Sequence, residues 1–381
     1  PRRDHSIRIP RPDLTVSLDI PNACNGCHHD QSKEETPQWA QAKCDEWYGP
    51  PKGPPHFAHA IAAGRRMKPE GHGLLVDVVR RKDTRAMVRA SAISLLSRYG
   101  SGDAEAAAVA GLEDAEGLVR AASARSLQEL VPAAELHRRL APLLRDPVRS
   151  VRVEAVRALA LSPAPGGITT QSEREAFDAA LAEYMAGQEA VADQPAAHLN
   201  MAVIHAAQGR LDEAEASYRT ALRIDPEFIP ARINLAMFYD SRGDKVKAEE
   251  QFREVIELDP KQGEAYYSLG LLLAENEHRL PDAATMLSTA AKLLSDNPRV
   301  LYNYGLALQK LGRIEPAEKT LQAAHELAPA VADYLHALAI LYAQQNQWPR
   351  AIATAERLVA QHPREQAFRM LLEHFRQQGA A

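Results

Sequence analysis

The residues most able to do chemistry in this chain lie together in one short stretch, Cys24-Asn25-Gly26-Cys27-His28. Two cysteines separated by two residues and followed by histidine match the pattern of covalent haem attachment, in which both thiols become thioethers and the imidazole binds the iron. The spacing brings both sulfurs to one edge of a macrocycle and carries the histidine beneath it. Cys24 and Cys27 are therefore the predicted attachment points of at least one haem c, and His28 is the predicted proximal ligand.

Two other chemistries use the same residue types. A redox disulfide would need a thioredoxin-like strand-to-helix setting, and no βαβ pattern surrounds this stretch. A zinc site could draw thiolate and imidazole ligands from Cys24, Cys27, Cys44 and either His28 or His29. Outside that role, Cys44 is expected to be a buried small apolar side chain.

The second axial ligand of such a haem is open among six side chains near the motif, namely His5, His29, His56, His59, His72 and Met67. His5 ranks first because Arg8 and Arg11 follow it and could bind haem propionates through charge-assisted hydrogen bonds. His59, His56 and His29 follow in that order, since His56 and His59 lie three apart at an expected helix start and share a face. Met67 is expected to face solvent.

The composition is typical of an ordinary soluble protein. The chain has 381 residues, of which 45% are hydrophobic and 25% charged, which is enough for two or three domains. No apolar run approaches the roughly 18 residues of a membrane-spanning helix. The sequence begins at Pro1 without a basic and apolar leader, so we expect a processed or truncated piece of a longer protein.

The charge distribution argues against a general nucleic-acid binder. The formal net charge is -5, divided as about -1 over residues 1–55, about +5 over 56–160 and about -9 over the remainder. This asymmetry either steers docking with a charged partner or reflects solvated helix faces.

Residues 1–55 are predicted to be a loop-rich haem-binding segment. Prolines fix extended backbone near both ends, at Ile9-Pro10-Arg11-Pro12 and Gly49-Pro50-Pro51. The segment has too few apolar residues for a core of its own, and a covalently held macrocycle would supply the missing apolar mass. A helix is expected to start at Thr36-Pro37.

Three superimposable helical patterns follow in residues 56–162. An Asp, then Val-Arg, then apolar residues at helical spacing recur from Asp83, Asp114 and Asp146, a period of 31 or 32 residues. This pattern resembles the HEAT-like repeat family, which implies paired helices stacked into a solenoid. The Val-Arg arginines are expected to form a structural ladder with neighbouring acidic residues, or alternatively a binding stripe: Arg89, Arg120 and Arg152.

A second period of 34 or 35 residues fills residues 193–381. Phrases such as Gly209-Arg210-Leu211-Asp212-Glu213-Ala214 and Ala221-Leu222-Arg223-Ile224-Asp225-Pro226 resemble the tetratricopeptide repeat family. Five full repeats are expected across about 193–363, followed by a capping helix. Turn positions that are equivalent by this period are Gly209, Gly243, Glu277, Gly312 and Asn346.

The link between the two arrays and one irregular repeat are also predicted. The helix-opposing residues of Leu161 to Gly167 open a linker and half repeat at 163–192, in which Tyr184 aligns with Tyr218. The third repeat departs from the pattern at Glu277 and Ser295, so a longer turn is expected there. The fold class is thus mainly α: a haem segment followed by an α-solenoid of HEAT-like and tetratricopeptide helix pairs.

Tetratricopeptide arrays bind peptides or proteins in a groove, and the groove position here is mostly asparagine. It is occupied by Asn200, Asn234, Ser268, Asn303 and Ala337. Asparagine amides can hold an extended peptide backbone, although asparagine is also the residue that the family prefers there. No Lys or Arg row marks a carboxylate clamp.

The haem motif combined with both repeat types resembles exported bacterial multihaem c-type cytochromes. The phrase Arg8-Ile9-Pro10-Arg11-Pro12-Asp13-Leu14 before Cys24 is part of this resemblance. It implies haem attachment outside the cytoplasm, in the periplasm or beyond the cell, electron transfer with redox partner proteins, and further haem motifs upstream.

The leading hypothesis is an electron-transfer c-type cytochrome whose repeats are a protein-docking scaffold. A haem enzyme or ligand sensor would need an open iron position with polar groups above it, which the sequence does not place. A third hypothesis is a zinc-stabilised interaction scaffold without haem. Enzymatic activity is therefore uncertain, and an electron carrier is favoured over a catalyst.

Overall fold

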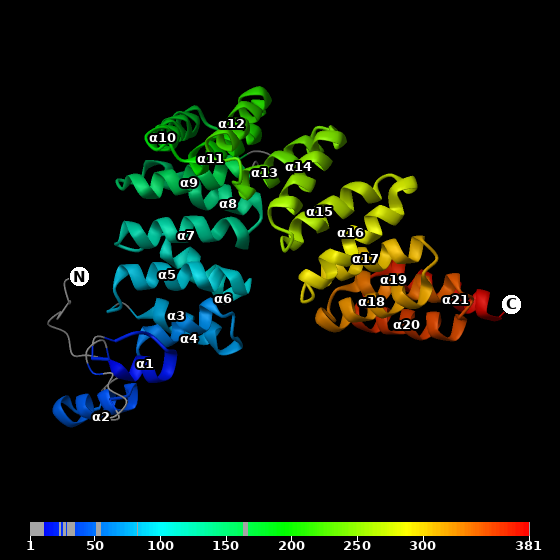
Figure 1. The fold of residues 1–381 in the computed structure, drawn as a ribbon, viewed down its shortest axis with the longest axis horizontal. Coiled ribbons are helices and arrows are strands. Elements are labelled where there is room, and N and C mark those ends of the chain that lie inside the picture. The colour runs from blue at the N-terminus through cyan, green and yellow to red at the C-terminus, as the bar shows by residue number, and fades with distance from the viewer. Residues whose placement is uncertain are drawn as a thin grey trace. The chain divides into compact units, whose positions relative to one another are not determined.

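The computed structural model describes residues 11–22, 24–25, 28, 35–50, 55–81, 83–162 and 167–380. The regular elements in these ranges are helices, in agreement with the predicted mainly α class (Figure 1). The chain divides into two compact units, Pro1–Gly187 and Gln188–Ala381. The finer division into four segments stays a prediction.

The first unit begins with two helices that precede the stacked pairs, α1 (Pro12–Leu18) and α2 (Pro37–Tyr48). The predicted helix start at Thr36 is confirmed, because its Oγ1 accepts a hydrogen bond from the Trp39 amide at 3.2 Å and Pro37 occupies the first helical position. α1 packs on α2 and touches the next helix. Few apolar residues are buried here, namely Leu14, Ala40 and Cys44.

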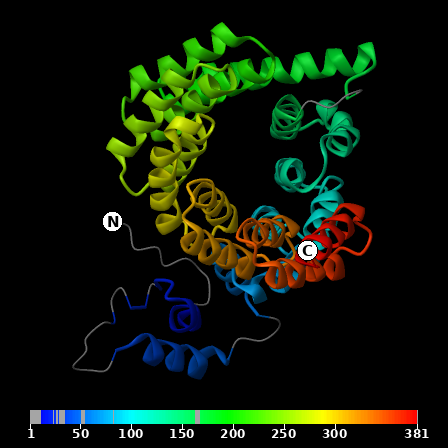
Figure 2. The same ribbon diagram turned by 90° about the vertical axis from the view of Figure 1, so that its right-hand side faces the viewer.

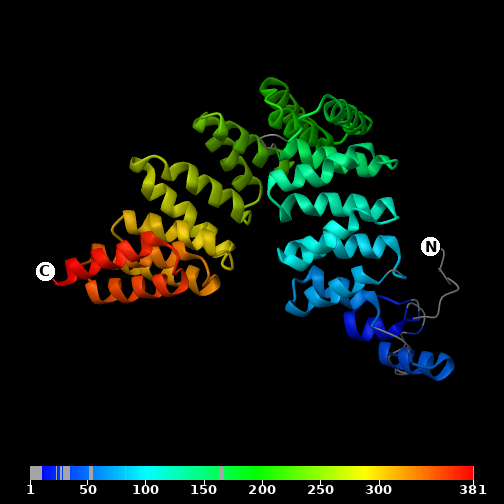
Figure 3. The same ribbon diagram turned by 180° about the vertical axis from the view of Figure 1, so that it is seen from behind.

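The helix pairs expected over residues 56–162 are present and lie in successive layers, which Figure 3 shows from behind. Alternate helices α3, α5, α7 and α9 stack on one another, and each neighbouring helix packs beside them. Leu75, Leu96 and Leu127 fill the space between layers and are fully buried. The elements are α3 (Phe57–Arg65), α4 (Pro69–Arg80), α5 (Ala86–Leu96), η2 (Ser97–Tyr99), α6 (Gly102–Gly111), α7 (Gly117–Leu130), α8 (Ala133–Leu140), η3 (Ala141–Arg145) and α9 (Arg149–Leu161).

The predicted arginine ladder is confirmed as a structural feature. Arg89 donates to both carboxylate oxygens of Asp114, at 2.8 and 3.0 Å, and Arg120 donates to both oxygens of Asp146, each at 2.8 Å. Each arginine therefore crosses to the acidic residue that precedes the next stacked helix. Arg120 also donates to the Asp114 carbonyl at 2.8 Å, so one guanidinium holds two successive turns.

The last rung of the ladder reaches the long helix α10 (Gln171–Glu189). Arg152 donates to both oxygens of Glu183 at 2.8 Å. α10 starts with a capping box, in which the Glu173 amide donates to Thr170 Oγ1 at 3.1 Å and the Thr170 amide donates to the Glu173 carboxylate at 3.0 Å. Tyr184, predicted to be equivalent to the core residue Tyr218, is buried on this helix.

The second unit contains the five helix pairs that the 34-residue period predicts, all within the described residues, and a closing helix (Figure 1). The closing helix α21 (Gln366–Ala380) packs on α20, in agreement with the predicted cap. The pairs are α11 (Pro195–Ala207) with α12 (Leu211–Ile224), α13 (Ile229–Ser241) with α14 (Lys245–Leu258), α15 (Gly263–Ala274) with α16 (Leu280–Leu293), α17 (Pro298–Lys310) with α18 (Ile314–Leu327), and α19 (Ala332–Gln344) with α20 (Trp348–Gln361).

The turns within these pairs require left-handed backbone. Gly209, Gly243 and Gly312 have φ values of 73°, 77° and 70°, and Asn346 takes the same role with φ 55°. The irregular third pair differs as predicted: a short 3₁₀ helix, η4 (Glu277–Arg279), stands in its turn. The turn positions found from the period are thus the positions where the chain reverses.

Breaking one rung of the ladder should destabilise the first unit. In Arg120→Gln, the carboxylate of Asp146, whose side chain is 6% exposed, loses its cation, and we expect unfolding free energy to fall by about 3 kcal/mol. Hydrogen bonds from Arg120 hold the pKa of Asp146 below its usual range. The penalty is therefore fully present above about pH 4, the unfolded pKa, and shrinks as acid protonates the folded carboxylate.

The measurement is urea denaturation followed by circular dichroism at neutral and acidic pH. Arg138→Gln is the control, because Arg138 pairs with Glu135 at the surface with its side chain 73% exposed. It should change stability by less than about 0.5 kcal/mol. Equal effects of the two substitutions would contradict a buried ladder.

Adding a side chain at a turn glycine should cost stability through backbone strain alone. A Cβ at Gly312 would meet nothing within 4 Å, yet φ is 70°, so Gly312→Ala is expected to lower the unfolding free energy by about 1 kcal/mol. Gly73, inside α4, also has open space around a new Cβ. Gly73→Ala should instead raise stability by roughly 0.5 kcal/mol. A thermal melt of both variants checks the opposite signs.

Candidate functional site

Hydrogen bonds link the described residues of the predicted motif, Cys24, Asn25 and His28. The His28 amide donates to the Cys24 carbonyl at 2.7 Å, a link that holds the two residues close together. Asn25 braces it, because its Nδ2 donates to the His28 carbonyl at 3.0 Å and to the Glu35 carbonyl at 3.3 Å. Cys27 lies outside the described residues.

The imidazole of His28 is oriented by two neighbours. Its Nδ1 is 3.5 Å from Glu35 Oε1, and its ring packs against Trp39 with the ring centroids 5.3 Å apart. Nε2 has no protein partner among the described residues, and the side chain is 54% exposed. A histidine held at Nδ1 with Nε2 open is the arrangement of a metal ligand.

Cys44 is buried on α2 and the thiol of Cys24 lies against it, so the two interact. Burial, and next the neighbouring Cys24, raise the pKa of the Cys44 thiol. The expectation of a buried small side chain is met, and its place beside Cys24 is one that the zinc alternative also requires. Neither cysteine is in a disulfide.

Among the candidate sixth ligands, His56 and His59 lie at the start of α3. His56 caps this helix, because its Nδ1 accepts a hydrogen bond from the Ala58 amide at 3.2 Å. Burial, followed by the positive charge of Arg11, lowers the pKa of His56. His59 is half-buried and its ring has no hydrogen-bond partner in the described ranges. The described parts show no contact between His28 and either of these histidines.

The remaining predicted site residues are His72, Met67 and Arg11, which the structure describes, and three that it does not. His72 is 2.8 Å from Ser101 Oγ and packs edge-on against Tyr99, which is a structural role. Met67 is 38% exposed, as expected. Arg11 donates from Nε and Nη2 to the two oxygens of Asp13, at 2.8 and 2.7 Å. Its Nη1 takes no part in this pair. The other predicted site residues lie outside the described residues: His5, Arg8 and His29.

The surroundings of the motif suit a flat apolar group. Three aromatic side chains of α2 and of the start of α3 are exposed, Trp47 at 64%, Tyr48 at 58% and Phe57 at 38%. Exposed aromatic side chains on helices with so small a buried core are typical of a surface that a further apolar body covers. The residues present therefore fit a covalently held macrocycle.

A protein-only metal site is not formed by the described residues. No three His, Cys, Asp or Glu side chains gather within these ranges. Two ligands of the zinc alternative, Cys27 and His29, lie outside them, so that alternative stays a hypothesis.

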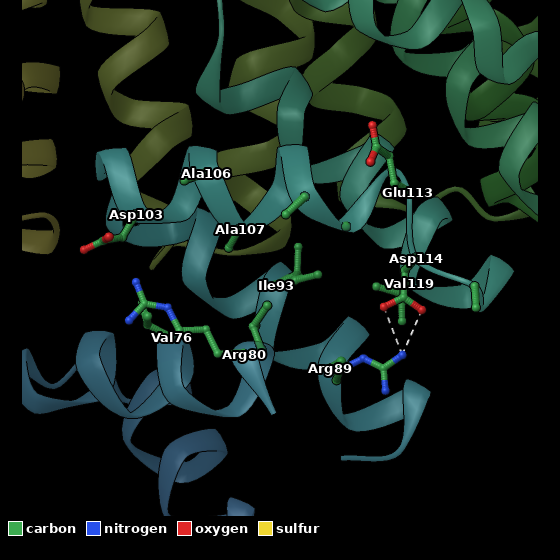
Figure 4. Close-up of a pocket in the computed structure, with 14 residues that line it drawn as sticks. Val76, Arg80, Arg89, Ile93, Asp103, Ala106, Ala107, Glu113, Asp114 and Val119 are labelled. Carbon is green, nitrogen blue, oxygen red and sulfur yellow. Dashed lines mark hydrogen bonds and ion pairs between the residues drawn. The ribbon is translucent and has the colours of Figure 1, made fainter. Parts of the chain in front are cut away.

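The first unit also contains a cavity of about 670 Å³ beside the ladder (Figure 4). Val76, Ile93 and Val119 line its apolar part. The nearby charges of Arg89 and Asp114 bind each other, as the dashed lines in Figure 4 show. Arg80, Asp103 and Glu113 also line the cavity, and Figure 4 draws no bond between them and the other lining residues.

The groove position predicted from the sequence lies on the first helix of each pair in the second unit. Successive first helices contact one another, as α11 does with α13, α15 with α17, and α17 with α19. Figure 2 shows the curved path from α13 to α21. The predicted asparagine row lies on these first helices, together with the exposed side chains of Met237 and Leu271 three positions further along.

Each asparagine of the row donates at least one hydrogen bond within the chain. Asn234 Nδ2 donates to the Pro230 carbonyl at 2.8 Å, and Asn303 Nδ2 donates to Tyr267 Oη at 2.7 Å. Asn200 Nδ2 donates to Gln188 at 2.9 Å. An amide nitrogen has two N–H donors, so Asn200 and Asn234 each keep one N–H beyond these bonds, and the amide oxygens of the row are further groups that a bound peptide could use.

A bilayer-spanning helix needs about 20 mostly apolar residues. None of the helices in the described parts of the chain meets this requirement.

The buried Cys44 thiol should resist alkylation in the folded protein. Because only the thiolate attacks iodoacetamide and burial raises the Cys44 pKa, we expect its modification at about pH 7.5 to be at least roughly tenfold slower in the native than in the urea-unfolded chain. Peptide mass spectrometry of the haem-free protein separates Cys44 from the other cysteines. Equal rates in both states would contradict the burial.

Three models of the tetratricopeptide repeat match the chain, at residues 205–275, at 173–227 and 336–381, and at 298–331. No curated protein matches it.

Several solved structures resemble part of the chain. A MamA chain from Desulfovibrio magneticus RS-1 is 18% identical and aligns over 45% of this chain and 97% of its own length, with a TM-score of 0.42. YrrB, described as a TPR protein with an unusual peptide-binding site, is 20% identical over 49% of this chain and 93% of YrrB, with a TM-score of 0.42. TTC0263, a thermophilic TPR protein from Thermus thermophilus, is 22% identical over 48% of this chain and 98% of its own, with a TM-score of 0.35. The family models and the repeated helix pairs together identify a tetratricopeptide-type solenoid, a protein-interaction scaffold, in the second half of this chain.

Proposed function

We propose that this protein is an electron-transfer c-type cytochrome whose helical repeats dock partner proteins. The observation that carries the proposal is the backbone hydrogen bond that holds His28 beside Cys24, with Nε2 of the imidazole left without a protein partner in the described residues. A haem bound there would supply one-electron exchange at iron.

The residues of this chain would divide the work of holding the group. Cys24 and Cys27 would tether it through thioether bonds, and His28 would bind the iron through Nε2 while Glu35 and Trp39 fix the ring. The exposed aromatic side chains of α2 and of the start of α3 would exclude water from its edge.

The arginines and the remaining histidines would complete the site. Arg11 would bind a propionate with the N–H groups of Nη1, which its pair with Asp13 leaves over. Arg8 would do the same. The sixth ligand would be His5, with His59, His56 and His29 as the alternatives.

Two further parts of the proposal concern place and partners. Haem attachment of this kind occurs outside the cytoplasm, so the protein is proposed to be periplasmic or extracellular. The interaction scaffold would hold a redox partner or a peptide on the first helices of the second unit. The exposed Met237 and Leu271 would supply apolar contacts there.

Expression with export and a c-type maturation system should give covalent haem. We expect a haem-stained band that survives denaturing electrophoresis, and we expect Cys24→Ser to reduce its intensity severalfold because one thioether is lost. Cys44→Ala is the control, since Cys44 is not part of the motif, and it should retain full staining. Absence of covalent haem from the exported protein would overturn the proposal.

The same preparation separates the remaining hypotheses. Reduced-minus-oxidised bands that do not move with carbon monoxide support an electron carrier with six ligands, and bands that move indicate an open iron position. Stoichiometric zinc without visible bands would establish the scaffold hypothesis instead.

A further inference from the structure

The carboxylate of Glu35 lies beside the imidazole of His28, the proposed proximal ligand. Its Oε1 is 3.5 Å from His28 Nδ1, and its side chain is only 16% exposed. The two residues are far enough apart in sequence that their contact depends on the fold. Asn25 joins them, since its single Nδ2 donates to the backbone carbonyls of both.

A carboxylate at this place has a definite effect on an imidazole. An ionised carboxylate can accept a hydrogen bond from an N–H group but cannot donate one. It therefore favours the tautomer in which Nδ1 carries the hydrogen and Nε2 presents its lone pair. Partial burial strengthens the interaction, because less water competes for the carboxylate oxygen. Trp39 packs against the ring at a centroid distance of 5.3 Å.

We propose that Glu35 is a positioning residue that fixes the Nδ1–H tautomer of His28 and, through it, lowers the reduction potential of the bound iron. The inference rests on the proposed function for its second half. An Nδ1–H shared with a carboxylate makes Nε2 a stronger electron donor, which favours the oxidised metal. The negative charge of Glu35 acts in the same direction.

The first experiment needs no haem. In the full-length chain produced without export and labelled with ¹⁵N-histidine, the His28 signals are assigned by their loss in His28→Gln. At about pH 9, well above the ordinary imidazole range, the wild type should show a protonated Nδ1 and an unprotonated Nε2. Glu35→Ala should shift the population toward Nε2–H. A wild-type His28 already in the Nε2–H form would overturn the tautomer assignment.

The second experiment measures the midpoint potential of the haem-loaded protein. Glu35→Gln should raise it, and Glu35→Asp, which keeps the carboxylate, should restore most of the difference. Glu46→Gln is the matched control: Glu46 lies on α2, pairs with Lys43 and is 60% exposed. It removes the same charge without touching His28 and should leave the potential within error of the wild type.

The outcomes separate this inference from the proposed function. Covalent haem with an unchanged potential in Glu35→Gln, or with equal shifts in Glu35→Gln and Glu46→Gln, overturns the inference and leaves the cytochrome proposal standing. Absence of haem overturns the proposed function and the claim about potential, while the NMR measurement still decides the tautomer. Circular dichroism of each variant establishes that the helices are retained.

Discussion

Every helix pair in this chain can bury its apolar face only against the pair before it and the pair after it. No sheet or central core gathers distant segments in the described parts of the chain, so the fold depends on links between neighbours that are repeated along it. In the first unit the link is ionic and directional: an arginine near the start of one stacked helix binds the acid that precedes the next. Because Arg120 is only 12% exposed and Asp146 only 6%, each depends on the other to remain charged in the interior.

The second unit uses a different link for the same purpose. Its pairs approach closely where a small residue meets a leucine, as Gly305 does with Leu321, and a Cβ on that glycine would lie 2.7 Å from the leucine side chain. The chain then reverses through left-handed turns. Close packing tolerates little change in volume, which explains why the same small residues return with every repeat and why the period is visible in the sequence.

This difference between repeated and unrepeated contacts decides how much could be predicted. The ladder arginines, the turn at Gly312 and the irregular turn at Glu277 were found because each is one copy of a pattern whose other copies define it. The contacts of His28 with Glu35 and of Cys44 with Cys24 have no second copy. The contact of His28 with Glu35 arises from loop geometry, which spacing and residue type do not reveal. Residue type grouped Cys44 with Cys24 only as possible zinc ligands. The internal hydrogen bonds of Asn234 and Asn303 escaped prediction for the same reason, since residue type shows a free amide and only coordinates show its partner.

A solenoid also needs its two ends covered, because the outer faces of the terminal pairs have no neighbour. At the carboxyl end, α21 covers the last pair and buries Phe375 and Leu372. At the amino end, α1 touches α3 and is itself packed on α2, so the segment that carries the cysteine and histidine motif is also the cover of the first pair. That cover buries little apolar area of its own. A group bound covalently within it would therefore stabilise the end of the array as well as serve the chemistry, and its loss would expose the first stacked layer. On this argument the motif and the solenoid depend on each other physically, which gives a reason for one chain to contain both.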